Sequence, residues 1–304
     1  MADALTTRGL SVSQIEQLPQ VLPTVDPELG TSVRAELVRH SVEVLTDTAV
    51  KRLSRTPDAP GHLRVDAMTT HGEPVSRTTD LVLVVVGVRP NVELAASAGT
   101  TLGARGAIAV DRQMRTNLPH VYAAGDCIVT HHQLTGEAYL PLGTTAHKQG
   151  RIAGENALGG TREFVGSLGT QVVKVFDQAV ARTGLRDHEA KAAGFDPLTV
   201  ATQATDHTAY YPGAHQIEIR YTGDRTTGRL LGLQLFGHRH AEIAKRIDIA
   251  ATAIHHRMSV DAISDLDLSY TPPLGSPWDA IQAGAQTWVQ SASRGFAEAA
   301  LKET

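Results

Sequence analysis

The sequence has a single cysteine, Cys127, among its 304 residues, and only 4% of the residues are aromatic. One cysteine cannot form a disulfide within the chain, which excludes a small secreted scaffold held together by disulfides. The start, MADALTTRGL, also lacks the basic residues and the apolar core of a secretion signal. We therefore expect a reducing, cytoplasmic environment.

Long apolar runs and an excess of positive charge are missing as well. The longest purely apolar run, LVLVVV at 81–86, is too short to span a bilayer. The formal net charge of −4 offers no basic surface for nucleic acid. We therefore expect neither a membrane nor a nucleic acid as a partner.

Histidine is plentiful, with 14 residues, but it does not have the spacing of a metal site. Adjacent histidines do not provide tetrahedral ligand spacing, and no cysteine or carboxylate cluster joins them in the sequence. We therefore predict no metal. The close histidine pairs are His131–His132, His238 with His240, and His255–His256.

What the chain does have is the alternation of an α/β protein, with 41% apolar residues and enough length for two or three domains. Apolar spacing predicts helices at 2–8 and 27–40, and strands at 10–16 and 42–45, with Leu10, Val12 and Ile15 buried. Three short strands at 49–54, 63–68 and 73–78 then predict an antiparallel meander that leads into a buried strand at 81–86.

The rest of the chain divides into further units. We predict a strand at 120–126 and a helix at 142–158, followed by strands near 170–177, 199–204, 215–222 and 229–237 and an amphipathic helix at 241–256. The expected domains are 1–115, 116–165 and 166–290, with a tail at 291–304.

Glu16 closes the strand predicted at 10–16. In a nucleotide-binding βαβ unit, an acidic residue at such a strand end binds the ribose, about 20 residues after a glycine-rich loop. Counting back from Glu16 places that loop upstream of Met1. On this residue alone, a solvated glutamate in a turn is the favoured interpretation, and the functional one depends on the rest of the sequence.

Four ordered motifs carry a resemblance that extends over nearly the whole chain. They are VVVGVRPN at 84–91, VYAAGDC at 121–127, LPLGTTAHKQGRIAGEN at 140–156, and YYPGA at 210–214 together with DLDLSYTPPLGSPWD at 265–279. In this order they resemble the flavin-dependent pyridine nucleotide–disulfide oxidoreductases, most closely the branch of coenzyme A-disulfide reductases, NADH oxidases and NADH peroxidases. The resemblance implies partial Rossmann-type nucleotide-binding domains plus a C-terminal α+β dimerisation domain, and a homodimer.

By this resemblance, the flavin FAD is contacted at two places. The carboxylate of Asp126 would accept a hydrogen bond from the ribityl chain, and Gly125 would let that chain come close to the backbone. Leu142, Gly143 and Thr144 would begin a helix whose N-terminus faces the pyrimidine edge of the flavin. The alternative for the last three residues is an ordinary capped surface helix.

The nicotinamide cofactor would meet Glu16 and Gly87, although a simple turn after a strand also explains Gly87. Glu16 repels a 2′-phosphate, and residues 17–20 contain no arginine, so NADH is favoured over NADPH. Tyr210 or Tyr211, together with Tyr270, resemble tyrosines that cross the dimer interface to the partner's active site. Plain packing is the alternative for these tyrosines.

The resemblance also implies an N-terminal truncation. The family's first flavin-binding segment, its redox-active residue and the NAD glycine loop would all precede Met1, so FAD binding by this chain alone should be weak or absent. Cys127 is then a packing residue and no nucleophile.

Two functions follow from this. One is an oxidoreductase that passes hydride from NAD(P)H to FAD and on to a disulfide, persulfide or oxygen, completed by a separate N-terminal chain, a full-length relative or a longer gene product. The alternative is a non-catalytic remnant that acts as a dimerisation or interaction module.

Overall fold

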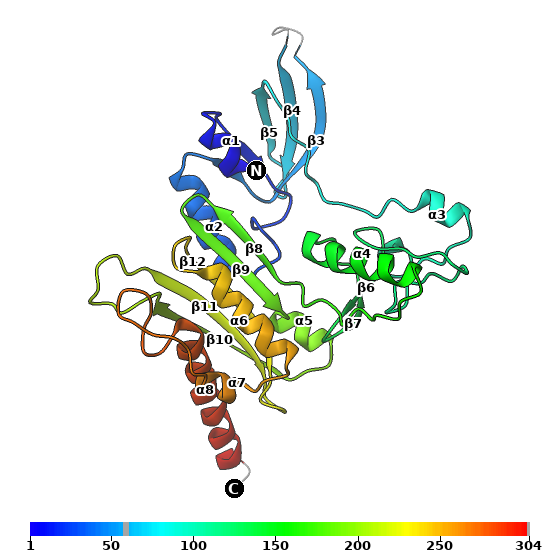
Figure 1. Cartoon of the computed structure of the whole chain (residues 1–304). Coiled ribbons are helices and arrows are strands. Elements are labelled where there is room, and N and C mark those ends of the chain that lie inside the picture. Colours follow the sequence, from blue (N-terminus) through cyan, green and yellow to red (C-terminus); the bar gives the residue numbers. More distant parts are fainter. Residues whose placement is uncertain (57–60, 303–304) are drawn as a thin grey trace.

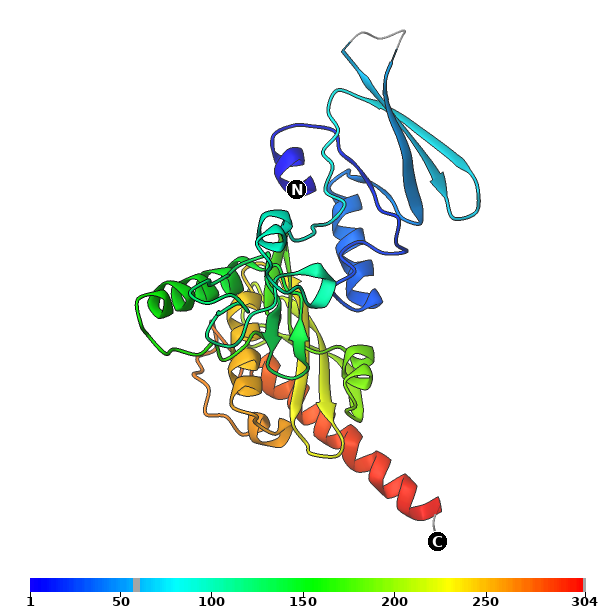
Figure 2. The same cartoon turned by 90° about the vertical axis from the view of Figure 1, so that its right-hand side faces the viewer.

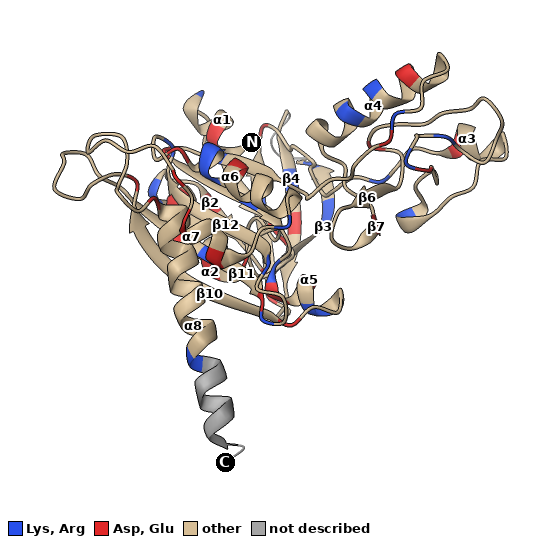
Figure 3. Cartoon of the chain, turned by 60° about the horizontal axis from the view of Figure 1, so that its bottom comes forward, with Lys and Arg blue, Asp and Glu red and all other residues tan. Residues whose placement is uncertain are grey.

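The computed structural model describes residues 1–56 and 61–302, which form a mixed α/β chain (Figure 1). No described helix is long and apolar enough to cross a membrane. Figure 3 shows acidic and basic residues interspersed along the ribbon. The helices are α1 (Ala2–Thr7), α2 (Pro27–Arg39), α3 (Glu93–Ser97), α4 (Gly143–Ala157), α5 (Asp187–Ala192), α6 (Ile243–His255), α7 (Val260–Ser264) and α8 (Ala280–Lys302), with a short 3-10 turn at Ala104–Gly106.

The strands of the described residues fall into four sheets. A parallel pair joins β1 (Ser13–Ile15) to β2 (Glu43–Leu45), and an antiparallel meander is formed by β3 (Thr48–Arg55), β4 (Leu63–Thr69) and β5 (Pro74–Thr79). A two-stranded piece pairs β6 (Thr130–His132) with β7 (Gly136–Ala138). The largest sheet contains β8 (Gln171–Val175), β9 (Gln178–Gly184), β10 (Pro197–Thr205), β11 (Gln216–Asp224) and β12 (Leu230–His238).

This five-stranded sheet is antiparallel throughout, in the order β10-β11-β12-β9-β8. Successive residues of a strand point to opposite faces. In β9, Ala179 and Ala181 join the core formed with α6 and α8, whereas Val180 joins the core formed with α2. The sheet is therefore covered on both faces, by α6 and α8 on one and by α2 on the other.

Helix α2 packs on the sheet because of its apolar spacing. Leu29, Val33 and Leu37 recur every fourth residue, and all three are buried against Val180 and Phe236. Burial of each such side chain stabilises the fold by about 2 kcal/mol. The predicted helix at 27–40 and strand at 42–45 are confirmed, as are the meander and the amphipathic helix now seen as α6.

The predicted buried strand at 81–86 is wrong. Residues 81–90 form neither helix nor strand, and Val84, Val85 and Val86 are 60%, 67% and 91% exposed. A strand buried on both faces needs neighbours to pair with, and among the described residues the only parallel strands are β1 and β2, which pair with each other. The apolar run therefore lies open.

The strand predicted at 120–126 is also wrong, since this segment makes only an isolated bridge between Tyr122 and Arg115. Leu10 is exposed, and Val12 and Ile15 are only half-buried, so the first predicted strand shortens to β1. The helix predicted at 142–158 is confirmed as α4. It packs Ile152 against a small core formed by Ile108, Met114, Ile128 and Phe164.

The 170–177 segment contains a turn that the sequence did not signal. The strand predicted near 170–177 is β8 together with the turn that follows it, and the chain reverses at Phe176, with φ +52°, into β9. Figure 2 shows the meander and α8 projecting from opposite ends of the molecule. Helix α8 continues through the Ala- and Ser-rich segment, in which the alanines favour helix.

Candidate functional site

Gly125 lies against the first turns of α4. Its φ of +92° favours glycine, and a Cβ placed there would lie 3.8 Å from the Cβ of Ala146. The Gly125 N–H donates to Gln149 Oε1 at 3.2 Å, and Gln149 Nε2 donates to Thr130 Oγ1 at 3.1 Å. Gln149, which is 1% exposed, therefore ties the turn at Gly125 and Asp126, here called the GD turn, to α4. The sequence did not single it out, although its position inside the helix motif offered a signal.

Asp126 follows with an exposed side chain. The hydroxyl of Tyr139 donates to the Asp126 carbonyl at 2.9 Å, which holds this backbone in place. Burial and the nearby Asp126 carboxylate raise the pKa of Tyr139, so the phenol remains a proton donor at neutral pH. The Asp126 carboxylate is thus presented to solvent on a fixed backbone.

The N-terminus of α4 is open. Leu142 precedes the helix in an extended conformation, and no side chain among the described residues caps the helix start. Gly143 and Thr144 are exposed in the first turn. Their backbone N–H groups and the positive end of the helix dipole can therefore bind an electron-rich group from outside.

A cavity of about 490 Å³ lies between α4 and α6. Thr145 Oγ1 meets Ser167 Oγ at 3.1 Å on its wall, and His255 Nδ1 meets Gln133 Oε1 at 3.1 Å. Hydroxyl, amide and basic groups dominate the lining, so a polar or negatively charged group suits it. The remaining polar side chains of the wall are Thr144, Lys148, Thr170, Asp248, Thr252 and His256.

The two residues expected at the nicotinamide cofactor lie in separate environments. Glu16 follows β1 directly, and its Oε1 accepts the Leu18 N–H at 3.0 Å. Gly87 has φ +105° and lies within the exposed 81–90 segment. Among the described residues, no hydrogen bond or ion pair joins Glu16 to that segment, so the structure does not bring the two residues together.

The tyrosines of the C-terminal part occupy two loops that are tied together. Thr208 donates its N–H and its hydroxyl to the Gly275 carbonyl, at 2.9 and 3.0 Å. Tyr210, Tyr211 and Tyr270 are 78%, 43% and 46% exposed on these loops. Leu274 and Trp278 are exposed beside them in the sequence of the second loop. An exposed apolar group of this kind suits contact with another molecule.

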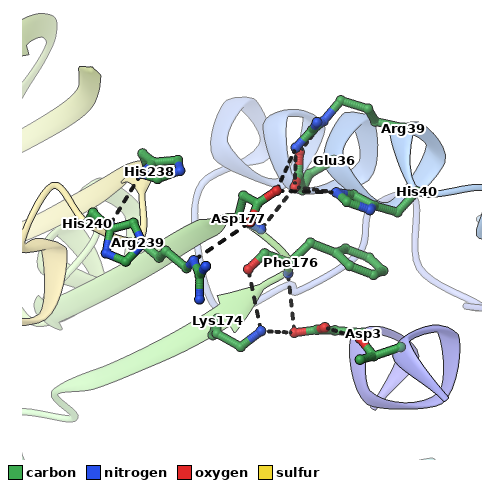
Figure 4. Close-up of polar contacts among 11 residues, drawn as sticks. Asp3, Glu36, Arg39, His40, Lys174, Phe176, Asp177, His238, Arg239 and His240 are labelled. Atoms are coloured by element: carbon green, nitrogen blue, oxygen red, sulfur yellow. Dashed lines mark hydrogen bonds and ion pairs between the residues drawn. The ribbon is translucent and has the colours of Figure 1, made fainter. Parts of the chain in front are cut away.

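A cluster of potential metal ligands joins residues that are far apart in the sequence. Glu36, His40 and Asp177 place their ligand atoms within 4.8 Å of one another. Arg39, however, donates two hydrogen bonds of 2.8 Å to the Glu36 carboxylate, and Arg39 and Arg239 each lie 3.7 Å from Asp177 (Figure 4). The two arginines already supply the positive charge, so the cluster is an ion-pair network between α2 and the β8–β9 turn.

The histidine at 132 and the single cysteine both have structural contacts. His132 is buried, its Nδ1 accepts the Leu134 N–H at 3.2 Å, and burial lowers its pKa. Cys127 is half-buried beside the small core, with Sγ 3.6 Å from the Ala124 carbonyl. Both placements suit packing residues.

Comparison with known proteins covers most of the chain. Residues 1–150 match the family described as pyridine nucleotide-disulphide oxidoreductase, and residues 170–280 match its dimerisation domain. The NAD(P)H sulfur oxidoreductase (CoA-dependent) of Pyrococcus furiosus is 37% identical over 281 residues, which are 92% of this chain and 61% of that protein. The coenzyme A disulfide reductase of Staphylococcus epidermidis is 28% identical over 90% of this chain and 60% of its own.

A solved structure shows the same fold. The NAD-dependent persulfide reductase from A. fulgidus has a TM-score of 0.88 and 36% identity, covering 96% of this chain and 53% of that one. The chain thus spans about 60% of the length of the curated relatives it matches. On both the sequence matches and the fold, the chain belongs to the pyridine nucleotide–disulphide oxidoreductase family.

Proposed function

We propose that this chain supplies the nicotinamide-binding, flavin-contacting and dimerisation parts of an FAD- and NAD(P)H-dependent oxidoreductase. The observation that carries the proposal is the GD turn at Gly125, which is fastened beside the open N-terminus of α4. The relatives are named as sulfur oxidoreductase, coenzyme A disulfide reductase and persulfide reductase, which favours a disulfide or persulfide as the final acceptor. No observation favours the alternative of a non-catalytic remnant.

The residues present fit one end of a flavin. The exposed Asp126 carboxylate would accept a hydrogen bond from a ribityl hydroxyl, and Gly125 leaves room for that chain. The N–H groups of Gly143 and Thr144, with Leu142 before them, would stabilise negative charge at the pyrimidine edge. The bound flavin would supply the two-electron chemistry, taking a hydride from NAD(P)H.

Glu16 and Gly87 are the residues we propose for the nicotinamide cofactor. The Glu16 backbone N–H donates to the Leu45 carbonyl at 2.8 Å, and Oε1 is held by Leu18, so the carboxylate has a fixed direction. Its Oε2 has no partner within the described chain and would accept from the ribose hydroxyls. The negative charge favours NADH over NADPH.

The exposed run at 81–86 supports a completing polypeptide. Six consecutive apolar residues, four of them valines of high β-propensity, lie unpaired in the described chain. We propose that strands of a further segment, joined to this chain or supplied separately, pair here and bring the glycine-rich loops that hold the cofactor phosphates. The C-terminal sheet domain would form a homodimer, with Tyr211 and Tyr270 at its contact face.

Flavin retention tests this proposal. The chain is purified together with a polypeptide that carries the family's N-terminal flavin-binding segment, and the bound FAD is counted by absorbance. We expect Asp126→Ala to weaken FAD binding by about tenfold or more, because one hydrogen bond to a charged group is worth about 1.5–3 kcal/mol. Asp80→Ala, which removes a carboxylate that is 89% exposed on the meander, is the control. Equal FAD binding by both variants would contradict the assigned role.

A further inference from the structure

The loop that carries Tyr211 is closed on one buried carboxylate. Asp206 follows β10 directly, and its side chain is 8% exposed. Its backbone N–H donates to the His215 carbonyl at 2.9 Å, and its Oδ1 accepts the His215 N–H at 2.9 Å. Asp206 therefore joins the two ends of the loop at 206–215.

The same carboxylate holds the imidazole of His207. His207 Nδ1 lies 2.9 Å from Asp206 Oδ1, and the His207 backbone N–H donates to that oxygen at 2.8 Å. A carboxylate at Nδ1 keeps the proton on that nitrogen and fixes the direction of the ring. The ring is 12% exposed, and its Nε2 is buried without a hydrogen-bond partner among the described residues.

The ring so held packs against Tyr211. The centroids of His207 and Tyr211 lie 6.3 Å apart, with the planes at 74°, an edge-to-face contact. The Tyr211 N–H also donates to the Thr208 carbonyl at 2.8 Å, which closes a turn over residues 208–211. Because the Tyr211 side chain is 43% exposed, a fixed neighbour on its inner side restricts how it can rotate.

Asp206 is in turn anchored to the helices of the domain. Arg246, on α6 and 7% exposed, donates from Nη2 to the Asp206 carbonyl at 2.6 Å. The same guanidinium pairs with Asp279, at the start of α8, at 2.8 Å. A continuous series of hydrogen bonds and packed rings therefore leads from the domain core to Tyr211.

We propose that Asp206 and His207 are positioning residues that fix the Tyr211 ring in the direction it needs at the dimer face. The inference rests on the proposed function, in which Tyr211 reaches the partner's reaction centre. Asp206 sets the His207 ring, and that ring restricts Tyr211, while neither residue contacts the reacting atoms. An ordinary role in loop stability would instead affect unfolding and leave the ring direction of the folded protein unchanged.

The test places 3-fluorotyrosine at position 211 and records the ¹⁹F spectrum of the full chain without any cofactor. In the parent chain we expect a resonance clearly displaced from that of free fluorotyrosine. In His207→Ala this displacement should shrink by at least half. His207→Phe keeps an aromatic edge at this place and should restore most of the displacement. Two controls should leave the spectrum unchanged. In the first, the label stays at position 211 and the substitution is His240→Ala. In the second, the substitution is His207→Ala and the label is at position 270.

The completed FAD enzyme gives a second readout. His207→Ala should lower kcat about tenfold and leave the KM for NADH unchanged, since NADH is bound elsewhere. Unchanged fluorine spectra in His207→Ala would overturn the inference even if the enzyme is active. If the fluorine resonance responds to His207→Ala as expected but the wild-type complex is inactive, the positioning role is upheld and the proposed function is contradicted. If His207→Ala does not fold, His207→Leu, which fills the same space without an aromatic ring, is scored by the same two criteria.

Discussion

Individual ion pairs hold the first part of the chain on the C-terminal sheet. Asp26, 8% exposed, accepts from Arg220 Nε at 2.5 Å, and Arg182 donates to the Thr24 carbonyl at 2.7 Å. Arg182 also pairs with Glu189 at 2.7 Å, with side chains 10% and 28% exposed. Such half-buried pairs are costly to break from one side, because the remaining charge stays in a poorly hydrated place.

The contribution of such an ion pair to stability can be measured at the Glu189 carboxylate. Burial alone would raise its pKa, but the hydrogen bonds and charge of Arg182, with further hydrogen bonds from Arg186, lower the pKa from 4.5 to about 2. A carboxyl with a depressed pKa in the folded state stabilises the fold above its unfolded pKa, and this contribution is lost as pH falls toward 2. We predict that Glu189→Gln lowers the free energy of unfolding by about 2–3 kcal/mol at pH 7.

The difference between Glu189→Gln and the parent should shrink between about pH 4.5 and pH 2, measured by urea unfolding at several pH values. Glu163→Gln is the control, because its carboxylate is 56% exposed and 3.9 Å from Arg112. A Glu189→Gln deficit that stays constant from pH 7 to pH 2.5 would show that the pair does not depress this pKa.

Cys127 and Asp126 are neighbours with different expected roles. Sγ packs at the edge of the small core, while the Asp126 carboxylate faces solvent beside α4. We predict that Cys127→Ser retains activity in the completed enzyme within about twofold and costs about 1 kcal/mol of stability. A folded, flavin-bound Cys127→Ser that is inactive would instead make the thiol catalytic.

At this scale the sequence motifs predicted the GD turn and the start of α4, because both are local in the chain. The sequence could not show that Gln149 clamps Gly125 to α4, nor that Glu36 and His40 meet Asp177. These contacts depend on how distant segments fold together. For the same reason the sequence could not show the pairing of His207 with the Asp206 carboxylate inside the loop at 206–215.

Among the elements, β9 and β12 come into close backbone contact with the chain around them at two glycines. Gly232 and Gly184 are register partners in these strands. A Cβ on Gly232 would lie 2.0 Å from the Leu185 carbonyl oxygen, and one on Gly184 would lie 2.1 Å from the Leu231 carbonyl oxygen. Backbone lies where a side chain would be, so only glycine fits without moving the strands.

We predict that Gly232→Ala lowers the free energy of unfolding by about 3 kcal/mol or more, since overpacking against backbone cannot be relieved by a side-chain rotation. Gly150→Ala provides the contrast. Gly150 is exposed in α4 with nothing within 4 Å of its Cβ position, so alanine should stabilise the chain by up to about 1 kcal/mol. Thermal unfolding of both variants checks the pair. Equal losses would contradict the packing argument.

The elements that the sequence predicted well are those with local periodicity. In helices α2, α4 and α6 the apolar residues recur at helical spacing within one segment. In the meander, turn residues separate three short strands. The prediction of a strand at 81–86 was wrong because a strand forms only when it has a partner to pair with. The turn at Phe176 was not predicted because it lacks glycine. Asp3 and Glu36 instead accept the N–H groups of Phe176 and Asp177, and His40 stacks on Phe176 at 3.8 Å.

The whole molecule combines a well-packed C-terminal domain with a more open N-terminal part. The C-terminal sheet is covered on both faces, whereas residues 81–88 expose six large apolar side chains, at Leu81, Leu83, Val84, Val85, Val86 and Val88. A run of this composition promotes association of the isolated chain.

We predict that replacing Val84 and Val86 with threonine reduces self-association of the chain alone, because the change removes apolar surface while keeping β-branched side chains. Light scattering at increasing concentration checks this. The same substitutions should weaken binding of the completing polypeptide several-fold. Val165→Thr, at an exposed valine outside the run and outside the flavin motif, is the control. Equal effects at both places would argue against 81–86 as the pairing strand.

The central claim is that this chain forms one part of a flavin- and nicotinamide-linked oxidoreductase. The direct measurement is the visible absorbance of the completed complex under anaerobic conditions, before and after addition of NADH. We predict flavin bands that the chain alone does not retain, and their bleaching by NADH, with Glu16→Ala needing about tenfold more NADH. A folded complex that holds no flavin, or holds flavin that NADH leaves oxidised, would contradict the account.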